Sequence, residues 1–205
     1  MISAVIFDLD GVIVDSNKAI FETYKQTARI IGEKEPESEQ IRALLGQPSS
    51  INLKHLFGNN SEARVTYNEV VKRTHADLPF LPYVRAELRK IKIPKAIVTS
   101  KRKDNAEAVL RDLKELFETI ITPEQTKQQK PHPEPLLLAC TQLDITPENV
   151  AYVGDTIRDC ETALNAGTKF IGFVHDGATS EEFKKAGANI QIRSFKELGQ
   201  IILGM

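Results

Sequence analysis

The sequence predicts an α/β fold, a doubly wound, Rossmann-like parallel sheet into which an all-helical segment is inserted. Two observations predict this fold. Short apolar segments rich in β-branched and aromatic residues alternate with segments whose apolar residues recur at helical spacing, which is the pattern of βαβ units. From residue 36 to about residue 81, however, only the helical spacing occurs. The helical segment therefore follows the first strand and interrupts an α/β core.

The first expected strand covers residues 3–8, and its near-continuous apolar character suits a parallel sheet that is buried on both faces. A helix begins after Asp15 and Ser16, which can cap its first turn, and it ends at Gly32. The later elements expected are helices at 84–91, 106–113, 135–143, 160–164 and 195–203 and strands at 96–99, 119–121, 150–153 and 170–174. The expected domains are a core of residues 1–15 and 81–205 and a helical cap of residues 16–80.

Composition and charge exclude several classes of protein. The 205 residues are 41% hydrophobic and 27% charged, which is ordinary globular composition and excludes disorder over the whole chain. With 27 Lys and Arg against 28 Asp and Glu, no strongly basic surface is expected, so nucleic acid is not an expected partner. No apolar run approaches the ~20 residues of a membrane span, and no leader is visible. We expect a cytoplasmic protein without a membrane partner, in which Cys140 and Cys160 are reduced, buried thiols.

Pairs of carboxylates follow two of the expected strands. Asp8 and Asp10 end the first strand, where residues two apart point the same way, and Gly11 comes next. Asp155 and Asp159 follow a later strand and lie one helical turn apart. Two carboxylates that face one site are costly unless a cation or a proton lies between them, and carboxylate oxygens without nearby His or Cys suit Mg²⁺. Taken alone, each pair could equally consist of capping or turn residues.

Two further strand ends carry groups that suit an anion. Thr99 and Ser100 close a strand just before a helix, where a hydroxyl and free backbone N–H groups can hold a phosphate. A plain helix cap by Ser100 is the alternative. Lys130 precedes a proline-rich segment that sets a rigid approach to the next helix. A fixed ammonium there could neutralise charge on a phosphoryl group, or it could be one more surface lysine.

Taken together, the four strand ends resemble the four motifs of the haloacid dehalogenase superfamily of phosphotransferases. The segments that carry the resemblance are, in order, Phe7-Asp8-Leu9-Asp10-Gly11-Val12-Ile13-Val14-Asp15-Ser16, Val98-Thr99-Ser100, Lys130-Pro131-His132-Pro133 and Gly154-Asp155-Thr156-Ile157-Arg158-Asp159. Their order and spacing agree over the whole chain. The helical insertion is similar to the cap of the subfamily that contains phosphoglycolate phosphatases and β-phosphoglucomutases.

The resemblance implies a role for each motif. Asp8 is the nucleophile that accepts the phosphoryl group, and Asp10 is the general acid and base, which requires a raised pKa at Asp10. Mg²⁺ is held by the Asp8 and Asp155 carboxylates and the Asp10 carbonyl, with Asp159 completing the metal site. The groups implied to hold the phosphoryl oxygens are Thr99, Lys130 and the backbone at Gly11 and Ser100.

Residues of the cap and its surroundings are expected to select the substrate, with the cap hinging near residues 14–16 and 79–83. The candidates for this selection are Gly46, Gln47, Ser49 and Arg102. Asp10 disfavours dehalogenation and C–P cleavage, because the resembled enzymes with those activities lack this carboxylate. Ile20 and Ser49 stand where the similar mutases carry a histidine and a basic residue. Water is therefore the expected phosphoryl acceptor.

The expected function is the Mg²⁺-dependent hydrolysis of a small phosphomonoester, similar to phosphoglycolate, through an aspartyl phosphate. A phosphosugar mutase resembling β-phosphoglucomutase and a pyrophosphatase are alternatives among phosphoryl-transfer enzymes. A phospho-accepting receiver-type signalling module is the alternative from a different class, although such modules are shorter and have no cap. A further alternative is a binding protein that has lost catalytic activity. The expected partner is a small phosphorylated metabolite, and the expected assembly is a monomer or a homodimer.

Overall fold

A six-stranded parallel sheet forms the centre of the computed structural model, which describes residues 1–75 and 77–205. The strands are β1 (Ala4–Phe7), β2 (Lys95–Val98), β3 (Thr119–Ile121), β4 (Val150–Gly154), β5 (Lys169–Phe173) and β6 (Gln191–Ile192). Their order in the sheet is β3-β2-β1-β4-β5-β6. The chain starts at a central strand, winds outward to β3 and then winds outward on the other side to β6. This topology confirms the predicted doubly wound α/β fold.

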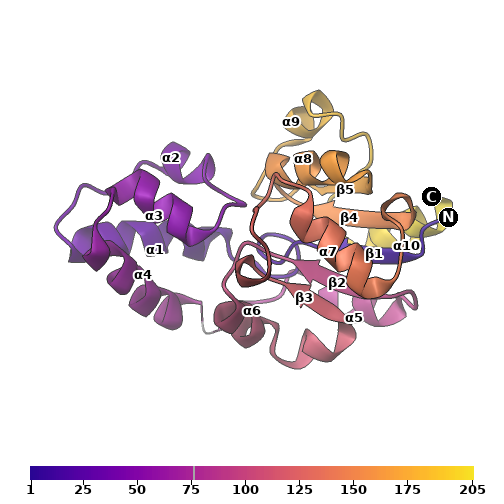
Figure 1. The fold of residues 1–205 in the computed structure, drawn as a ribbon, viewed down its shortest axis with the longest axis horizontal. Helices are drawn as coiled ribbons and strands as arrows, with labels where there is room; N and C mark the ends of the chain where they lie inside the picture. The colour runs from indigo at the N-terminus through magenta and orange to yellow at the C-terminus, as the bar shows by residue number, and fades with distance from the viewer. Residues whose placement is uncertain (76) are drawn as a thin grey trace.

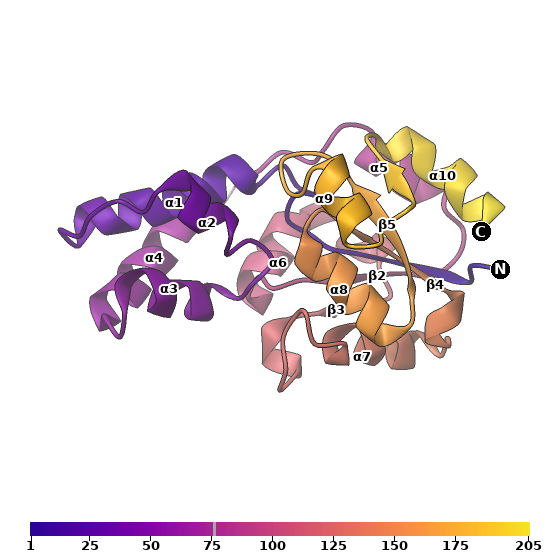
Figure 2. The same cartoon turned by 90° about the horizontal axis from the view of Figure 1, so that it is seen from above.

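Alternate residues of the central strands enter two different cores. Val5 and Phe7 belong to the core on one face of the sheet, whereas Ala4 and Ile6 belong to the core on the other face. The first face is covered by α5 (Val84–Lys90), α6 (Lys103–Leu110) and α10 (Phe195–Gly204), and the second by α7 (Glu134–Leu143), α8 (Ile157–Ala166) and α9 (Ser180–Lys185). Figure 2 shows α10 and α7 on opposite sides of the strands. Burial on both faces explains why the strands are apolar almost without interruption.

The predicted helical insertion forms a separate lobe beside the sheet (Figure 1). It consists of α1 (Asn17–Ile30), α2 (Ser38–Arg42), α3 (Ser49–Phe57) and α4 (Ser61–Thr74). The described residues between 36 and 81 contain no strand, as predicted, but only an isolated bridge at Phe80. The lobe has a small core of its own, made of Tyr24, Ile41, Leu53, Tyr67 and Val71.

Two linkers connect this cap to the sheet, and they pair with each other. Val14 forms an isolated bridge with Phe80. The Asp15 N–H donates to the Pro79 carbonyl at 2.9 Å, and the Leu81 N–H donates to the carbonyl of Ile13 at 3.0 Å. Both linkers therefore lie just beyond the carboxyl end of β1. The borders of the cap at residues 15 and 80 remain a prediction.

One strand and one α-helix of the described residues, β6 and α9, have no counterpart in the sequence analysis. The strand β6 has two residues, which is too short for any periodicity to show. The helix α9 has one buried residue, Phe183, so it lacks an apolar stripe. A capping box between Thr179 and Glu182 begins α9 and is a signal that could have predicted it. At α1 the predicted cap differs, because Ser16 occupies the N-cap position but makes no side-chain capping bond.

The two cysteines behave as the sequence predicts. Cys140 and Cys160 are buried, free thiols on α7 and α8. Burial raises the pKa of both thiols to about 11, so they stay protonated and unreactive near neutral pH.

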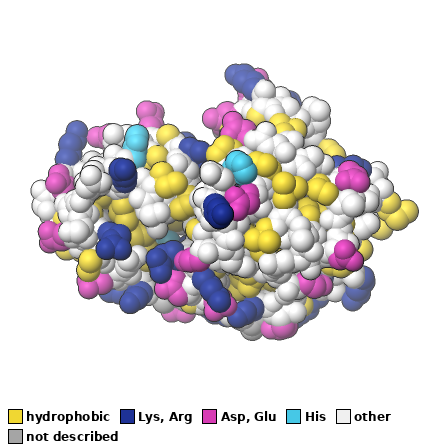
Figure 3. Space-filling model, in the orientation of Figure 1, with side chains coloured by type: hydrophobic (Ala, Val, Ile, Leu, Met, Phe, Trp, Pro, Cys, Tyr) yellow, Lys and Arg dark blue, Asp and Glu magenta, His cyan; other side chains and the backbone are white. Residues whose placement is uncertain are grey.

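The surface is mixed in charge. On the face shown in Figure 3, acidic and basic side chains are interspersed rather than gathered into a region of one sign. In the described part of the chain, no helix combines the length and the apolarity needed to span a bilayer.

Candidate active site

Three buried carboxylates from two neighbouring strands meet at one edge of the sheet. Asp8 directly follows β1, and Asp155 and Asp159 follow β4, which pairs with β1. One oxygen of each carboxylate lies within 4.8 Å of the others. Since the strands are parallel, their carboxyl ends open onto the same space, which is the expected place for a ligand in such a sheet.

Asp155 has an oxygen that no protein group satisfies. Its Oδ2 accepts a hydrogen bond from Asn17 Nδ2 at 3.2 Å, whereas its Oδ1 is buried without a hydrogen-bond partner among the described residues. Burial, followed by the charges of Asp159 and Asp8, holds the pKa of Asp155 well above its usual value. A buried oxygen without a partner is costly, so this group is arranged for a ligand.

Two glycines make room for the Asp155 carboxylate. A Cβ atom at Gly11 would lie 2.1 Å from Asp155 Oδ2, and one at Gly177 would lie 2.5 Å from the same atom. Gly11 also has a φ of +74°, a left-handed conformation that favours glycine. Gly11 was expected to bind phosphate through its backbone, but its N–H donates to the Val14 carbonyl at 2.9 Å. Its part in the structure is therefore to leave space for Asp155 and to turn the chain.

The residues at this edge fit a divalent cation. The free donor is a carboxylate oxygen, which is the ligand type that Mg²⁺ prefers. Four buried or half-buried carboxylates, Asp8, Asp10, Asp155 and Asp159, face two ammonium groups, Lys101 and Lys130. With all four carboxylates ionised, the site would carry two excess negative charges, which a divalent cation would balance. Asp8 and Asp155, which contribute to the cluster from neighbouring strand ends, are the carboxylates placed to hold it.

Lys130 lies beside two members of the acidic cluster, Asp8 and Asp159. Its Nζ is 3.1 Å from Asp8 Oδ1 and 2.7 Å from Asp159 Oδ1, and its side chain is 2% exposed. Burial alone would lower the pKa of Lys130, but the charges of Asp159 and Asp8 raise it above its usual value. The ammonium is therefore fixed in position and permanently charged.

Asp159 holds Lys130 in this position. Besides Lys130, its Oδ1 accepts a hydrogen bond from the Tyr152 hydroxyl at 2.8 Å. Its Oδ2 accepts from the Thr156 N–H at 3.1 Å and from the Thr156 hydroxyl at 2.5 Å. The Asp159 carboxylate thus has four protein donors, in contrast to the free oxygen of Asp155. Asp159 was expected in the metal site; one of its oxygens lies within 4.8 Å of those of Asp8 and Asp155, and its contacts also make it an anchor for the lysine.

Asp8 is surrounded by groups of both signs. Burial raises the pKa of Asp8 to about 7; Lys130 acts against this rise, and Asp159 and Asp10 add to it. A cation at the site would act in the same direction as Lys130 and favour the ionised carboxylate.

Asp10 is paired with Lys101, a lysine that the sequence analysis did not single out. The Lys101 Nζ lies 3.1 Å from Asp10 Oδ1, and the lysine side chain is 7% exposed. Burial has the largest single effect on Asp10 and would raise its pKa, but the Lys101 ammonium and other neighbouring polar groups together lower it below the usual value. The expected raised pKa is therefore not found, because the groups around Asp10, first among them a cation from the loop after β2, together outweigh the effect of burial.

Thr99 and Ser100 lie at the end of β2, next to this ion pair. Thr99 is buried, and its hydroxyl accepts a hydrogen bond from the Lys101 N–H at 3.1 Å. The Ser100 hydroxyl donates to the carbonyl of Gly46 in the cap at 2.6 Å. The alternative that Ser100 caps the next helix is wrong, because α6 begins at Lys103 with Arg102 at its N-cap.

A cavity of about 70 Å³ brings the strand ends and the cap together. Asp8, Asp10, Ser100 and Asp155 line it from the core. The residues predicted to select the substrate, Gly46, Gln47, Ser49 and Arg102, line it as well. Thr99, Lys130 and Asp159 do not line this cavity, although Lys130 reaches it indirectly through Asp8. Arg102 is half-exposed, with its Nε 3.7 Å from Asp104 and 4.0 Å from Glu124.

Several contacting residues were missed because they lie outside the four motifs. Asn17 begins α1 and bonds Asp155, and Lys101 directly follows Ser100. Arg42 reaches from the cap to the loop after β5, where its Nη1 donates to the Gly177 carbonyl at 3.1 Å. The sequence could have placed that loop at the site, because β5 is also a parallel strand and its carboxyl end faces the site.

The cap also contributes His75, which lies in a buried position beside Lys101. Its Nδ1 is 3.2 Å from Lys101 Nζ, and its Nε2 is 3.2 Å from the Thr23 hydroxyl. Burial, followed by the Lys101 charge, lowers the pKa of His75 to about 4. The imidazole is therefore neutral in the folded protein near neutral pH.

This neutral histidine predicts a pH-dependent stability. Between pH 6.5 and 4 the unfolded chain protonates His75 while the folded chain does not, so acidification removes stability in this window. The free energy of unfolding of the wild type, minus that of the His75→Asn variant, should fall by about 3 kcal/mol from pH 7 to pH 4. Urea unfolding at several pH values without Mg²⁺ measures the difference, and the subtraction cancels the titration of Asp8. A difference independent of pH would contradict the lowered pKa.

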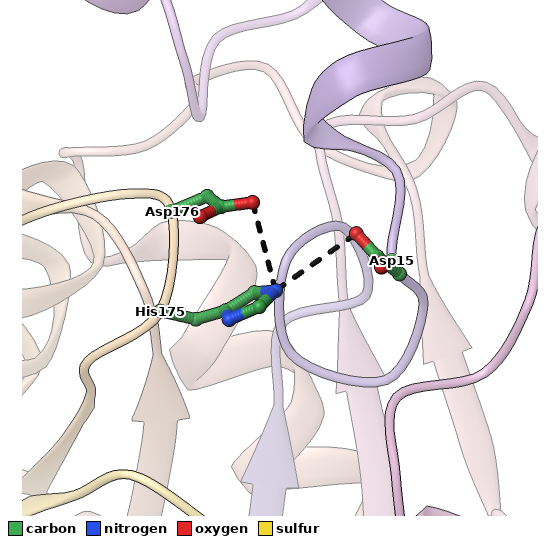
Figure 4. Close-up of side chains that lie close together, drawn as sticks. All are labelled: Asp15, His175 and Asp176. Carbon is green, nitrogen blue, oxygen red and sulfur yellow. Dashed lines mark ion pairs between the residues drawn. The ribbon is translucent and has the colours of Figure 1, made fainter.

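A second group of potential metal ligands lies at the surface, near the first linker. His175, after β5, points its Nε2 toward Asp15 Oδ1 at 3.8 Å and Asp176 Oδ2 at 3.7 Å (Figure 4). These side chains are between one-third and two-thirds exposed. Ion pairs of this kind contribute little, and the group is separate from the buried carboxylates.

Comparison with known proteins assigns the family. Residues 5–173 match the sequence family described as haloacid dehalogenase-like hydrolase. The pyrophosphatase PpaX of Bacillus velezensis is 30% identical over 178 residues, which cover 83% of this chain and 82% of that protein. The phosphorylated carbohydrates phosphatase of Thermotoga maritima is 29% identical over 201 residues, covering 90% and 91% of the two chains.

A solved structure agrees with the sequence comparison. The β-phosphoglucomutase of Clostridium difficile has a TM-score of 0.81 and 25% identity, over 97% of this chain and 93% of that chain. The family predicted from the four motifs is thus confirmed by a match over most of the chain and by a shared fold. The chain belongs to the haloacid dehalogenase-like hydrolases.

Proposed function

We propose that this phosphatase hydrolyses a small phosphomonoester with the Asp8 carboxylate as nucleophile. An Asp8 oxygen attacks phosphorus, and the bond from phosphorus to the leaving oxygen breaks. Asp10, which is ionised beside Lys101 in the free enzyme, must first take up a proton from solvent as substrate binds, and it gives this proton to the leaving oxygen. A water oxygen then attacks phosphorus while Asp10 takes one of its protons. The bond between phosphorus and Asp8 breaks, so inorganic phosphate leaves, and both carboxyl groups return to their starting state once Asp10 has released its proton to solvent.

The single observation that carries this proposal is the environment of Asp8. Its carboxylate lines the cavity, lies 3.1 Å from the buried Lys130 ammonium and is close to the unsatisfied Asp155. A carboxylate that only stabilised the fold would not need a second buried carboxylate with a free oxygen beside it. A nucleophile that must approach a negatively charged phosphoryl group does need neighbouring cations.

The other residues take their proposed roles from their contacts. Asp8 and Asp155 would hold Mg²⁺ together with the Asp10 carbonyl, and the ion would supply positive charge for the phosphoryl oxygens. The Ser100 N–H, at the cavity, would hold the same oxygens. Lys130, which contacts Asp8, and Thr99 do not line the cavity, and they would reach these oxygens only when the substrate is bound. Asp159 would act through Lys130, since its own oxygens already accept four protein hydrogen bonds.

Removal of Mg²⁺ is expected to silence the enzyme. With EDTA, release of p-nitrophenol from p-nitrophenyl phosphate should stop, and excess Mg²⁺ should restore it, because the carboxylate repulsion returns when the ion leaves. Independently of activity, titration calorimetry should show Mg²⁺ binding to the wild type and none to Asp155→Asn. The exposed Asp176→Asn variant is the matched control and should bind Mg²⁺ normally. Activity that is indifferent to chelation would remove the metal from the mechanism.

The cap side of the cavity favours a substrate with one anionic group. Among the described residues that line it from the cap, none is Lys or Arg. The cationic lining residues, Lys101 and Arg102, come from the core and already face carboxylates. A second phosphate would therefore find no free cation in the cap, which ranks pyrophosphate, the substrate in the name of the Bacillus relative, below a phosphomonoester.

A panel of substrates tests this ranking. Phosphate release should be faster from small phosphomonoesters such as phosphoglycolate and glycerol phosphate than from pyrophosphate, because the second phosphate stays unpaired. A sugar phosphate supplied with its bisphosphate should be hydrolysed rather than isomerised, because Ile20 and Ser49 offer no base or cation in the cavity. Preferential cleavage of pyrophosphate, or an isomer as the main product, would select one of the alternatives instead.

A further inference from the structure

A continuous chain of contacts leads from the cap to Asp10. The Lys101 ammonium, in the loop after β2, lies 3.1 Å from Asp10 Oδ1 and 3.2 Å from His75 Nδ1. His75 follows α4 directly, and its Nε2 lies 3.2 Å from the Thr23 hydroxyl on α1. Asp10 and Lys101 belong to the core, whereas His75 and Thr23 belong to the cap lobe. The contact between Lys101 and His75 therefore crosses the boundary between the two.

The hydrogen bonds determine which group donates and which accepts in this series of contacts. The Thr23 hydroxyl donates to the Ala19 carbonyl at 2.7 Å, so toward His75 it acts as an acceptor. The imidazole consequently carries its proton on Nε2 and presents a lone pair at Nδ1. An ammonium has protons only to donate, so Lys101 donates to His75 Nδ1, and its charge forms an ion pair with Asp10 Oδ1 at the same time.

We propose that Lys101 is a positioning residue for Asp10 and that His75 holds the Lys101 ammonium in place when the cap is closed. The proposal rests on the function proposed above, in which Asp10 accepts a proton from water. Lys101 reaches a carboxylate oxygen from one side, so it fixes the orientation of the Asp10 carboxylate toward the cavity. When the cap moves away, His75 leaves Lys101, and the lysine loses one of its two acceptors.

Closure of the cap would thus complete the arrangement needed for the second step. In that step the water oxygen bonds to phosphorus, its proton passes to Asp10, and the bond from phosphorus to Asp8 breaks. The first step with p-nitrophenyl phosphate makes a smaller demand on Asp10, because p-nitrophenolate leaves without a proton. A substitution that only misplaces Asp10 should therefore slow the second step and leave the first step largely unchanged.

Pre-steady-state kinetics of the full chain with Mg²⁺ and p-nitrophenyl phosphate test the proposal. The p-nitrophenolate burst reports formation of the aspartyl phosphate, the steady state reports its hydrolysis, and acid quenching measures the phosphoenzyme. In Lys101→Met the burst should persist while the steady-state rate falls by about 10²-fold, so phosphoenzyme accumulates. Lys101→Arg, which keeps a cation, should recover part of the steady-state rate. Lys103→Met, an exposed lysine two residues further on, is the matched control and should behave as wild type.

Variants of His75 test the connection to the cap. His75→Leu removes the acceptor and should slow the steady state by a smaller factor than Lys101→Met, whereas His75→Asn keeps an acceptor near Nδ1 and should lose less. The double variant Lys101→Met with His75→Leu should be no slower than Lys101→Met alone, because both changes break the same series of contacts to Asp10.

The outcomes separate this proposal from its alternatives. If burst and steady state fall together in Lys101→Met, or if neither changes, Lys101 serves stability alone and the proposal is wrong. Loss of folded protein cannot imitate the expected result, because it lowers the burst amplitude and the steady state in the same proportion. If the two substitutions lowered the steady-state rate by factors that multiply in the double variant, His75 would not act through Lys101. If Asp8→Asn still forms phosphoenzyme, the proposed function itself fails, whatever the Lys101 variants do.

Discussion

Replacement of Asp8 by asparagine is expected to abolish the hydrolysis of p-nitrophenyl phosphate. Asparagine keeps the shape of the side chain but offers no carboxylate oxygen to attack phosphorus, and the loss of a nucleophile costs at least about 10⁴-fold in kcat. The measurement is p-nitrophenol release at saturating Mg²⁺, together with the acid-quenched phosphoenzyme, which should be absent. Of all single substitutions in this chain, we expect this one to have the largest effect on activity.

Asp15→Asn is the matched control for this variant. Asp15 is also an aspartate near the carboxyl end of β1, but its side chain is 44% exposed and faces His175 rather than the cavity (Figure 4). Its activity should stay close to that of the wild type. Activity of Asp8→Asn within tenfold of the wild type would refute the assignment of Asp8 as nucleophile.

Replacement of Lys130 by methionine should damage both stability and activity. The substitution keeps the length of the buried side chain but leaves the Asp8 and Asp159 carboxylates, now 3.1 Å and 2.7 Å from the ammonium, without their shared cation. Breaking a buried ion pair from one side costs about 3–5 kcal/mol of unfolding free energy. Loss of a preorganised cation at the phosphoryl group should lower kcat by about 10²–10³-fold. Urea unfolding and p-nitrophenyl phosphate kinetics measure the two effects.

Lys95→Met separates the two effects. Lys95 is also buried, but its Nζ donates to the backbone carbonyls of Ile91 and Ile93 at 3.0 and 3.2 Å, at the opposite end of β2 from the site. This variant should lose some stability and keep its kcat. If Lys130→Met remained as stable as the wild type, the pair with Asp159 would not be the anchor described above. If its kcat stayed unchanged in folded protein, Lys130 would have no role at the phosphoryl group.

The layout of the molecule was predictable because its elements are separated by clear changes of period. The apolar runs before Asp8 and Asp155 indicated buried strands, and the helical spacing of residues 36–81 indicated that this segment contributes no strand to the sheet. Elements without such a period, α9 and β6, were missed. Their existence depends on Phe183 and Ile192 finding a place in cores that other segments build.

The approximate position of the site was also predictable, and the reason is topological. Parallel strands all end at one edge, so polar residues directly after Phe7, Val98 and Gly154 had to converge there. The division of labour among those residues was not predictable. Asp155 and Asp159 look alike in the sequence, yet one keeps a free oxygen and the other is satisfied by Lys130, Tyr152 and Thr156.

By itself, the sequence determined the order of the elements, the inserted cap and the set of strand ends that carry acidic, hydroxyl and ammonium groups. Only the tertiary structure decided which of these groups pair: Lys130 with Asp159, and Lys101 with Asp10 and a histidine from the cap. The physical reason is that periodicity records which side of an element is buried. A pKa or a free lone pair depends instead on donors and charges a few ångströms away, which folding brings in from distant parts of the chain.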